Sequence, residues 1–268
     1  MKLKVLTYNT LFAGRDGMEA RRAKAQIELI NNVSPDVFLM QEAKGFDGNG
    51  ARLLYEMEAR IGMRGFLAPA PRTGQNVAIF IRPTLTPLAF EVDSANFHHA
   101  LAVLTVSLPG TEKQVTFASA HLCPNGPVVR QREAAYLAVM AAPDNLALLA
   151  GDFNSASPHD PEPEGFDALS PHHRTRYLAE DLKIADRSVL AHLEAAGWVD
   201  TGAALDDHTP TVPSASFVAS EFAVMRCDYI MTSKALAALA SSYEVIRNPL
   251  TDAASDHYPV VATFTVPS

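Results

Sequence analysis

Several acidic, amide and histidine side chains follow directly after apolar runs, where they could meet in one catalytic or metal-binding site. The most distinctive run is Leu148–Ser155, which presents Asp152 and Asn154 after a buried-type segment. In an extended chain, residues two apart point to the same side, so these two side chains would project together. The carboxylate could orient a water molecule or accept its proton, and the amide could donate to a phosphate oxygen. A polar turn uses the same residue types, so both interpretations stay open for this segment alone.

The same arrangement recurs along the chain. The apolar run Val37–Met40 is followed by Gln41 and Glu42, and hard divalent cations prefer carboxylate oxygen ligands such as Glu42. Asp256 and His257 precede a final apolar run, and an imidazole suits proton transfer or phosphate contact because it titrates near neutrality. Asp228 opens another apolar run and could hold a histidine in one tautomer. Each residue could instead belong to an ordinary turn or cap.

Two further polar residues, Asn9 and His121, also end apolar runs. A lone histidine at such a position is more often structural than catalytic. In layered α/β proteins, however, strand ends of this kind can converge on one rim, where ligand sites commonly form. The joint pattern therefore predicts one site. Its predicted members are Asn9, Glu42, His121, Asp152, Asn154, Asp228, Asp256 and His257.

The elements expected to position these residues alternate between strands and helices, without an internal repeat. Strands are expected at Lys2–Tyr8, Val37–Gln41, Val77–Ile81, Leu85–Val92, Leu101–Leu108, Val115–His121, Leu146–Ala150, Tyr229–Thr232 and Val260–Val266. Helices are expected at Glu19–Val33, Leu53–Ile61, Val128–Met140 and Val189–Ala196. No linker is long or polar enough to divide the chain, so residues 1–268 are predicted to form a single α/β domain.

The composition fits a globular protein, with 48% hydrophobic and 19% charged residues. The formal net charge of -8 opposes a general polyanion binder, which usually carries a basic face. Two cysteines, Cys123 and Cys227, are too few for a disulfide framework and are expected to be buried thiols. There is no signal-type segment and no apolar stretch of membrane-spanning length, so a cytoplasmic protein without a membrane partner is expected.

Taken in order, the motifs resemble those of the endonuclease/exonuclease/phosphatase superfamily, and the resemblance spans nearly the whole chain. The resemblance implies a four-layer α/β sandwich (DNase-like), with two mixed central sheets flanked by helices. The matching motifs are Thr7-Tyr8-Asn9, Gln41-Glu42, His121-Leu122, Gly151-Asp152-Phe153-Asn154, Asp228-Tyr229-Ile230 and Ser255-Asp256-His257.

The resemblance also implies a metal-dependent hydrolase of phosphate esters that uses Mg²⁺ or Mn²⁺. Glu42 then corresponds to the main metal ligand, with Asn9 close by and Asp256 completing the site directly or through water. A divalent ion would neutralise charge on the substrate and polarise its phosphoryl group.

The remaining residues take catalytic roles in this resemblance. Asp152 orients or deprotonates the attacking water, and Asn154 contacts the scissile phosphate. His257 contacts that phosphate or transfers a proton, and Asp228 supports it. His121 stabilises the transition state or protonates the leaving group.

The substrate is less well specified than the chemistry. Members of the inositol-polyphosphate phosphatase branch carry Arg where this chain has Tyr229, which argues against that branch. Arg72, Arg174 and Arg176 lie in expected loops and could grip a phosphate or carboxylate, although they could equally be surface residues.

A polar, acidic loop follows Asn154, and it would repel a long polyanion if it lies over the site. Its acids are Asp160, Glu162, Glu164 and Asp167. We therefore expect a small phosphate ester as the substrate partner, with nucleic acid disfavoured by charge. A DNA or RNA nuclease is the alternative within the same class, and a non-hydrolytic enzyme or binding protein is the alternative outside it. Oligomeric state has no signature in the sequence.

Overall fold

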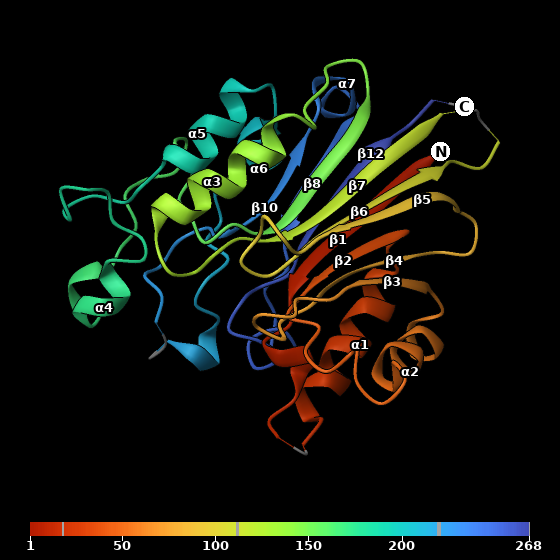
Figure 1. The fold of residues 1–268 in the computed structure, drawn as a ribbon, viewed down its shortest axis with the longest axis horizontal. Helices are drawn as coiled ribbons and strands as arrows, with labels where there is room; N and C mark the ends of the chain where they lie inside the picture. Colours follow the sequence, from red (N-terminus) through yellow and green to blue (C-terminus); the bar gives the residue numbers. More distant parts are fainter. Residues whose placement is uncertain (18, 111–112, 219–220, 268) are drawn as a thin grey trace.

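Two six-stranded mixed sheets pack face to face, and helices cover their outer faces (Figure 1). The computed structural model describes residues 1–17, 19–110, 113–218 and 221–267. The arrangement confirms the expected four-layer α/β sandwich.

The first sheet contains both ends of the chain, in the order β11-β12-β1-β2-β4-β3. Its strands are β1 (Lys2–Asn9), β2 (Val37–Gln41), β3 (Arg64–Ala68), β4 (Val77–Ile81), β11 (Ala240–Val245) and β12 (Val260–Thr265). The helices α1 (Arg21–Val33) and α2 (Arg52–Ile61) cover its outer face, where Ile30 and Met57 join Phe38 in one apolar cluster.

The second sheet has the order β5-β6-β7-β8-β10-β9. Its strands are β5 (Thr86–Asp93), β6 (Leu101–Ser107), β7 (Gln114–His121), β8 (Leu146–Asp152), β9 (Val199–Asp200) and β10 (Asp228–Thr232). The helices α3 (Pro127–Ala138) and α5 (Ser188–Ala195) cover its outer face. Shorter helices are η1 (Phe12–Gly14), η2 (Phe166–Ala168), α4 (Pro171–Arg174), α6 (Thr201–Ala204), η3 (Ala215–Phe217) and α7 (Lys234–Ala237).

The central strands are apolar on both sides because each sheet is buried on both faces. In β2, Leu39 points into the core between the sheets, whereas Phe38 and Met40 pack against the helices outside. The inter-sheet core also takes Phe117 and Leu148 from the second sheet. This double burial explains the continuous apolar runs that the sequence shows before its polar residues.

Strand pairing brings the polar ends to one edge of the sandwich. Strands β1 and β2 run parallel, with Asn9 opposite Gln41. Strands β7 and β8 also run parallel, with His121 opposite Asp152, and antiparallel β10 places Asp228 opposite Asp152 from the other side. Because parallel neighbouring strands end at the same edge of a sheet, residues far apart in the sequence lie close together at that edge.

The expected elements are present, with ends that differ by a few residues, and β5, β6 and β7 form an antiparallel meander. Three strands were not expected. The strand β3 contains Gly65, β11 is polar and half exposed, and β9 has only two residues. The first two lack a continuous apolar run because they lie at or near the edges of their sheet.

The cysteine expectation is confirmed, since Cys123 and Cys227 are free and buried. Among the described helices, none combines the length and apolar character needed to cross a membrane.

Candidate active site

All eight predicted site residues are buried, and the edge of the sandwich brings them together. Asp152 lies at the centre. Its Oδ2 accepts a hydrogen bond from Asn9 Nδ2 at 3.0 Å and lies 3.4 Å from His121 Nε2. His257 Nε2 lies 3.7 Å from the same oxygen. Three strand ends and the loop before β12 thus converge on one carboxylate.

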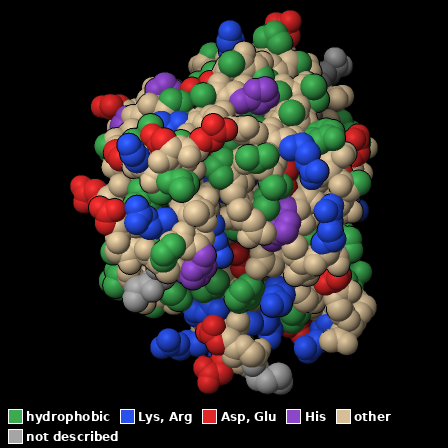
Figure 2. Space-filling model, turned by 60° about the vertical axis from the view of Figure 1, so that its left-hand side comes forward, with side chains coloured by type: hydrophobic (Ala, Val, Ile, Leu, Met, Phe, Trp, Pro, Cys, Tyr) green, Lys and Arg blue, Asp and Glu red, His purple; other side chains and the backbone are tan. Residues whose placement is uncertain are grey.

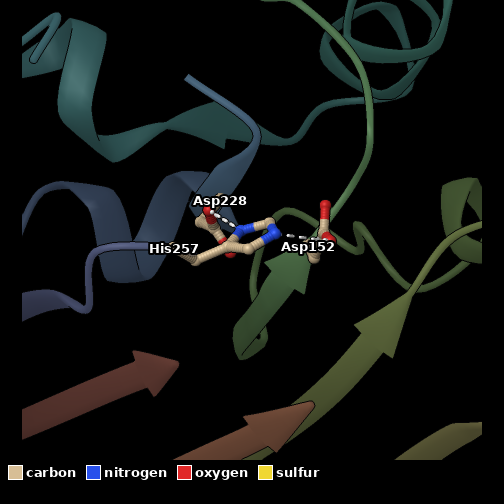
Figure 3. Close-up of side chains that lie close together, drawn as sticks. All are labelled: Asp152, Asp228 and His257. Atoms are coloured by element: carbon tan, nitrogen blue, oxygen red, sulfur yellow. Dashed lines mark hydrogen bonds and ion pairs between the residues drawn. The ribbon is translucent and has the colours of Figure 1, made fainter. Parts of the chain in front are cut away.

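His257 lies between two carboxylates, as Figure 3 shows. Its Nδ1 is 2.8 Å from Asp228 Oδ2, while its Nε2 faces Asp152. Asp228 is itself fixed by its backbone, because Asp228 N donates to Thr211 Oγ1 at 3.1 Å. A carboxylate at Nδ1 selects the tautomer in which Nε2 is free to act, so the pair is built to orient this histidine.

The surroundings of Asp152 and His257, which face each other, shift the pKa of each group. Burial raises the pKa of Asp152 to about 7, with the His257 cation opposing the rise and Asp228 adding to it. Burial acts to lower the pKa of His257, but Asp228 and Asp152 outweigh it and hold that pKa well above its usual range. A carboxyl group that titrates near neutrality beside a cationic imidazole is suited to proton transfer.

Glu42 occupies the other side of the site with Asn9. Its Oε1 accepts from Asn9 Nδ2 at 3.4 Å and its Oε2 from Phe12 N at 2.9 Å. Glu42 has a left-handed φ of 59°, and Leu11, Phe12 and Ala13 also have positive φ values. Non-glycine residues in this region are uncommon and concentrate at functional sites, so the backbone is bent here to aim the N–H at the carboxylate.

The position directly before Asp152 requires a glycine, Gly151. Its φ is 145°, and an added Cβ would lie 1.8 Å from the carbonyl oxygen of Ala120 on the neighbouring strand. Any side chain would therefore push β7 and β8 apart where His121 and Asp152 meet.

Asn154 reaches the site for a different reason from the one that the sequence suggested. Strand β8 ends at Asp152, and Asn154 has a left-handed φ of 48°, so the expected extended projection of the two side chains is wrong. Instead a turn folds back, with Asn154 N donating to Asp152 Oδ1 at 2.9 Å and Nδ2 donating to the Leu122 carbonyl at 3.0 Å. The amide has a second proton available for a ligand.

Two groups of residues could hold a cation. In the first, Asp152, Asp228 and His257 offer ligand atoms within 4.8 Å of one another. There Asp228 Oδ2 is hydrogen-bonded to His257 Nδ1, while Asp228 Oδ1 is buried and has no hydrogen-bond partner in the described part of the chain. The second group is Glu42 and Asp256, whose carboxylates accept hydrogen bonds from Asn9, Phe12 and Ser255.

The surroundings of Glu42 fit a divalent cation. Burial raises the pKa of Glu42, and the Asp256 carboxylate adds to the rise. Within the described ranges, neither acid forms an ion pair with a Lys or Arg side chain, although both are buried. Buried carboxylates without a cationic partner are costly, and hard divalent ions bind such oxygen donors.

The three arginines expected to bind substrate lie outside this cluster and have protein partners. Arg72 Nη2 donates to the carbonyls of Ser94, Ala95 and Phe97. Arg174 lies 3.4 Å from Asp167, and Arg176 pairs with Glu221. Their role in substrate binding stays a prediction.

The loop after Asn154 packs beside the site through aromatic rings. Phe166 stacks on Tyr177, Tyr177 contacts Phe222, and the Phe222 ring meets the His257 ring edge-on at 5.1 Å between centroids. The acids of this loop are largely paired: Asp160 binds Arg226, and Glu162 lies 3.1 Å from Arg187. Its repulsion of an anion is therefore weaker than a count of its acids indicates.

Other residues that support the site have no distinctive motif. Ser255 Oγ donates to the Asn9 carbonyl at 2.7 Å. Arg22 is charged, but it is only 4% exposed and donates to the carbonyls of Leu11 and Ala254. Gln26, one turn further along α1, also donates to the Ala254 carbonyl, so this helix ties together loops on both sides of the site. Their i, i+4 spacing was the available signal.

Comparison with known proteins points in the same direction. A sequence profile described as "Endonuclease/Exonuclease/phosphatase family" matches residues 6–257. No curated protein sequence matches the chain.

Similar solved structures share the fold over almost their full length. An AP endonuclease from Archaeoglobus fulgidus is 20% identical, with a TM-score of 0.70 over 98% of this chain and 100% of the other. TDP2 from D. rerio, complexed with single-strand DNA product, is 17% identical, with a TM-score of 0.65 over 99% of each chain. Mannosyl-6-phosphatase from Bacteroides thetaiotaomicron is 15% identical, with a TM-score of 0.68 over 97% of this chain and 98% of the other.

The profile match covers most of the chain, and the fold and the ordered polar strand ends agree with it. This protein belongs to the endonuclease/exonuclease/phosphatase family.

Proposed function

We propose that this protein is a metal-dependent hydrolase of phosphate esters. The observation that carries the proposal is the buried Asp152 carboxylate, which meets Asn9, His121 and His257 at one edge of the two sheets. A buried carboxylate without imidazole or amide neighbours would be expected to have only a structural role. A carboxylate with two imidazoles and an amide within about 4 Å is suited to water activation and to stabilising charge on a phosphoryl group.

Asp152 is the group that orients the attacking water and takes its proton, since its raised pKa makes it a competent base near neutrality. His257, held by Asp228, faces the same space with a proton on Nε2 and stabilises charge on a phosphate oxygen. His121 contributes a second imidazole close to the leaving group, and Asn154 supplies an amide proton. All four lie on rigid strand ends or tight turns, so little reorganisation is needed.

Mg²⁺ or Mn²⁺ would be held by Glu42 and Asp256, with Asn9 beside them. Such an ion supplies charge neutralisation and polarises the phosphoryl group. Without it, this corner of the site holds two buried carboxylates that repel each other, which supports the assignment.

The substrate that we favour is a small phosphate ester. Acidic and basic side chains are interspersed on the face in Figure 2, and the formal net charge is -8, which does not favour a long polyanion. Arg72, Arg174 and Arg176 are proposed contacts for the remainder of the substrate. Mannosyl-6-phosphatase, a protein of similar structure, supports this choice because its name indicates a sugar phosphate as the substrate.

A nuclease is the second candidate, because the structural relatives include an AP endonuclease and a TDP2 with bound single-strand DNA product. A non-hydrolytic member of the family is the third. All eight residues of the family-like motifs are present and buried, which supports catalysis over binding alone.

A substrate panel tests the proposal. It contains bis-p-nitrophenyl phosphate, sugar phosphates, nucleotides, RNA, and single-stranded and duplex DNA, each assayed with Mg²⁺, with Mn²⁺ and with EDTA. We expect metal-dependent hydrolysis that is lost in Asp152→Asn and His257→Ala. Turnover that survives EDTA and both substitutions would refute the mechanism, and preferred cleavage of DNA would select the nuclease.

Arg174→Ala tests the proposed substrate contact. We expect KM for the preferred ester to rise while kcat changes little, because the guanidinium lies away from the reacting atoms. Arg52→Ala, on the exposed surface of α2, is the matched control. An unchanged KM in the Arg174 variant would remove that residue from the site.

A further inference from the structure

Both site histidines face Asp152, yet only one of them is held by a hydrogen bond at its other nitrogen. His257 Nδ1 is bound by Asp228 at 2.8 Å. His121 Nδ1 is buried and has no hydrogen-bond partner in the described part of the chain. An imidazole with one free nitrogen can turn about its χ2 bond unless packing prevents it. Another contact must therefore fix the plane of the His121 ring.

That contact is a second imidazole. The ring of His99 lies parallel to the ring of His121, with centroids 4.1 Å apart and an interplanar angle of 17°. His99 is 2% exposed, so the pair is enclosed by protein. Its own plane is set by Thr73 Oγ1, which lies 2.8 Å from His99 Nδ1. The His98 ring also contacts the His99 ring in an edge-on arrangement, with the two centroids 4.8 Å apart.

A continuous series of contacts thus runs from a loop to the reaction centre. The backbone N–H of Gln75 donates to Thr73 Oγ1 at 3.3 Å, and Thr73 bonds His99. His99 stacks on His121, and His121 Nε2 lies 3.4 Å from Asp152 Oδ2. Rotating the His121 ring would drive its edge into the His99 face, because 4.1 Å leaves no space between stacked rings for a tilted one.

We propose that His99 is a positioning residue that holds the His121 ring in the plane where Nε2 faces Asp152. The catalytic part of this proposal rests on the proposed phosphoesterase activity. Stacking on His99 orients the His121 ring, whereas a hydrogen bond to Asp228 orients the His257 ring. His99 belongs to none of the motifs that mark the site, and its signal in the sequence was only the doublet His98-His99 before β6.

The role predicts a dependence on the flat ring rather than on its nitrogens. His99→Leu fills a similar volume without a flat ring, and His99→Phe keeps the ring without its nitrogens. An angstrom of misplacement of a catalytic group can cost about 100-fold in rate. We expect His99→Leu to lower kcat by about 10–100-fold with little change in KM, and His99→Phe to stay within about threefold of the wild type.

The test combines kinetics with a readout that needs no substrate. The rate of bis-p-nitrophenyl phosphate hydrolysis with Mn²⁺ is measured for the wild type and both variants. The control is His192→Ala, which replaces an exposed histidine of α5. In parallel, NMR of histidine-labelled protein follows the ring protons of His121. A ring stacked at 4.1 Å shifts these signals upfield, so we expect the shift to disappear in His99→Leu and to persist in His99→Phe.

The outcomes separate this proposal from the proposed function. Wild-type kcat in folded His99→Leu would overturn the positioning role, as would an equal loss of kcat in His99→Leu and His99→Phe. Unchanged His121 signals in His99→Leu would overturn the stacking itself. A wild type that hydrolyses no ester would overturn the proposed function and, with it, the catalytic role of His99. The NMR comparison would still report whether His99 sets the His121 ring.

Discussion

Arg226 is the residue whose removal tests the packing around the site most directly. It lies two positions before Asp228, and its guanidinium is fully buried between two carboxylates. It donates to Asp160 at 3.0 and 2.8 Å and to Asp200 at 2.9 and 2.6 Å. Arg226→Met keeps most of the length of the side chain but removes the guanidinium, which takes away the arginine partner of Asp200 and leaves Asp160 with the His208 imidazole alone.

The expected loss of stability follows from the burial of those carboxylates. Breaking a buried ion pair by removing one partner costs about 3–5 kcal/mol. Here two acids are affected: the Asp200 side chain is 1% exposed and the Asp160 side chain 9%. We therefore expect the upper part of that range, about 4–5 kcal/mol, which lowers Tm by roughly 8–20 °C in a protein of this size.

Urea unfolding followed by circular dichroism measures the change, with calorimetry for Tm. The matched control is Arg52→Met, because Arg52 pairs with Glu56 at 3.1 Å on the surface, where both side chains are about half exposed. Such pairs contribute about 0–1 kcal/mol. A loss in Arg226→Met no larger than in Arg52→Met would refute the reasoning.

Three further predictions concern the site itself. Asp228→Asn keeps an oxygen near His257 but loses its charge, which is worth about 1–2 kcal/mol, so we expect kcat/KM to fall about 5–30-fold and NMR titration to show a lower His257 pKa; unchanged values would contradict the pairing. Gly151→Ala places a Cβ 1.8 Å from a neighbouring carbonyl oxygen, so its urea midpoint should fall far more than that of Gly110→Ala, where nothing lies within 4 Å of an added Cβ. Burial raises the folded pKa of Asp152 to about 7, so the protonated carboxyl favours the folded state at acidic pH. In EDTA-treated protein we expect this contribution to stability to be lost as pH rises through about 7. Asp152→Asn should remove that decline in urea midpoint, and a decline of the same size in this variant would assign it to another group.

The identity of the site residues could be predicted from the sequence because each follows or precedes an apolar run. A strand buried on both faces is mostly apolar along its length, so an acidic, amide or histidine residue next to the apolar run marks the end at which the strand leaves the core. Glu42 after β2 and Asp152 at the end of β8 are both placed in this way. The helices α1 and α2 were predictable for a similar local reason, since their apolar residues recur with helical spacing.

The contacts within the site could not be predicted from the same pattern. Asn9 and Asp152 are 143 positions apart, and Asn9 and His257 are 248 apart. Only the strand registers decide that Asp152 lies opposite both His121 and Asp228 and so becomes the centre. The sequence also left open whether Asn154 lies in an extended chain or in a turn; the structure shows a turn, with a left-handed backbone and hydrogen bonds to Asp152 and Leu122.

The supporting residues show the same division. Arg22 is polar and has the character of a surface residue in sequence, yet it is buried because loop carbonyls near Leu11 and Ala254 need a donor. His99 carries no motif, and only the packing of β6 against β7 sets its ring on His121. The sequence by itself determined which polar side chains follow or precede buried strands and so form the candidate site, since solvent exclusion acts on each strand locally. Tertiary structure alone decided which of them touch, because pairing between distant strands sets those distances.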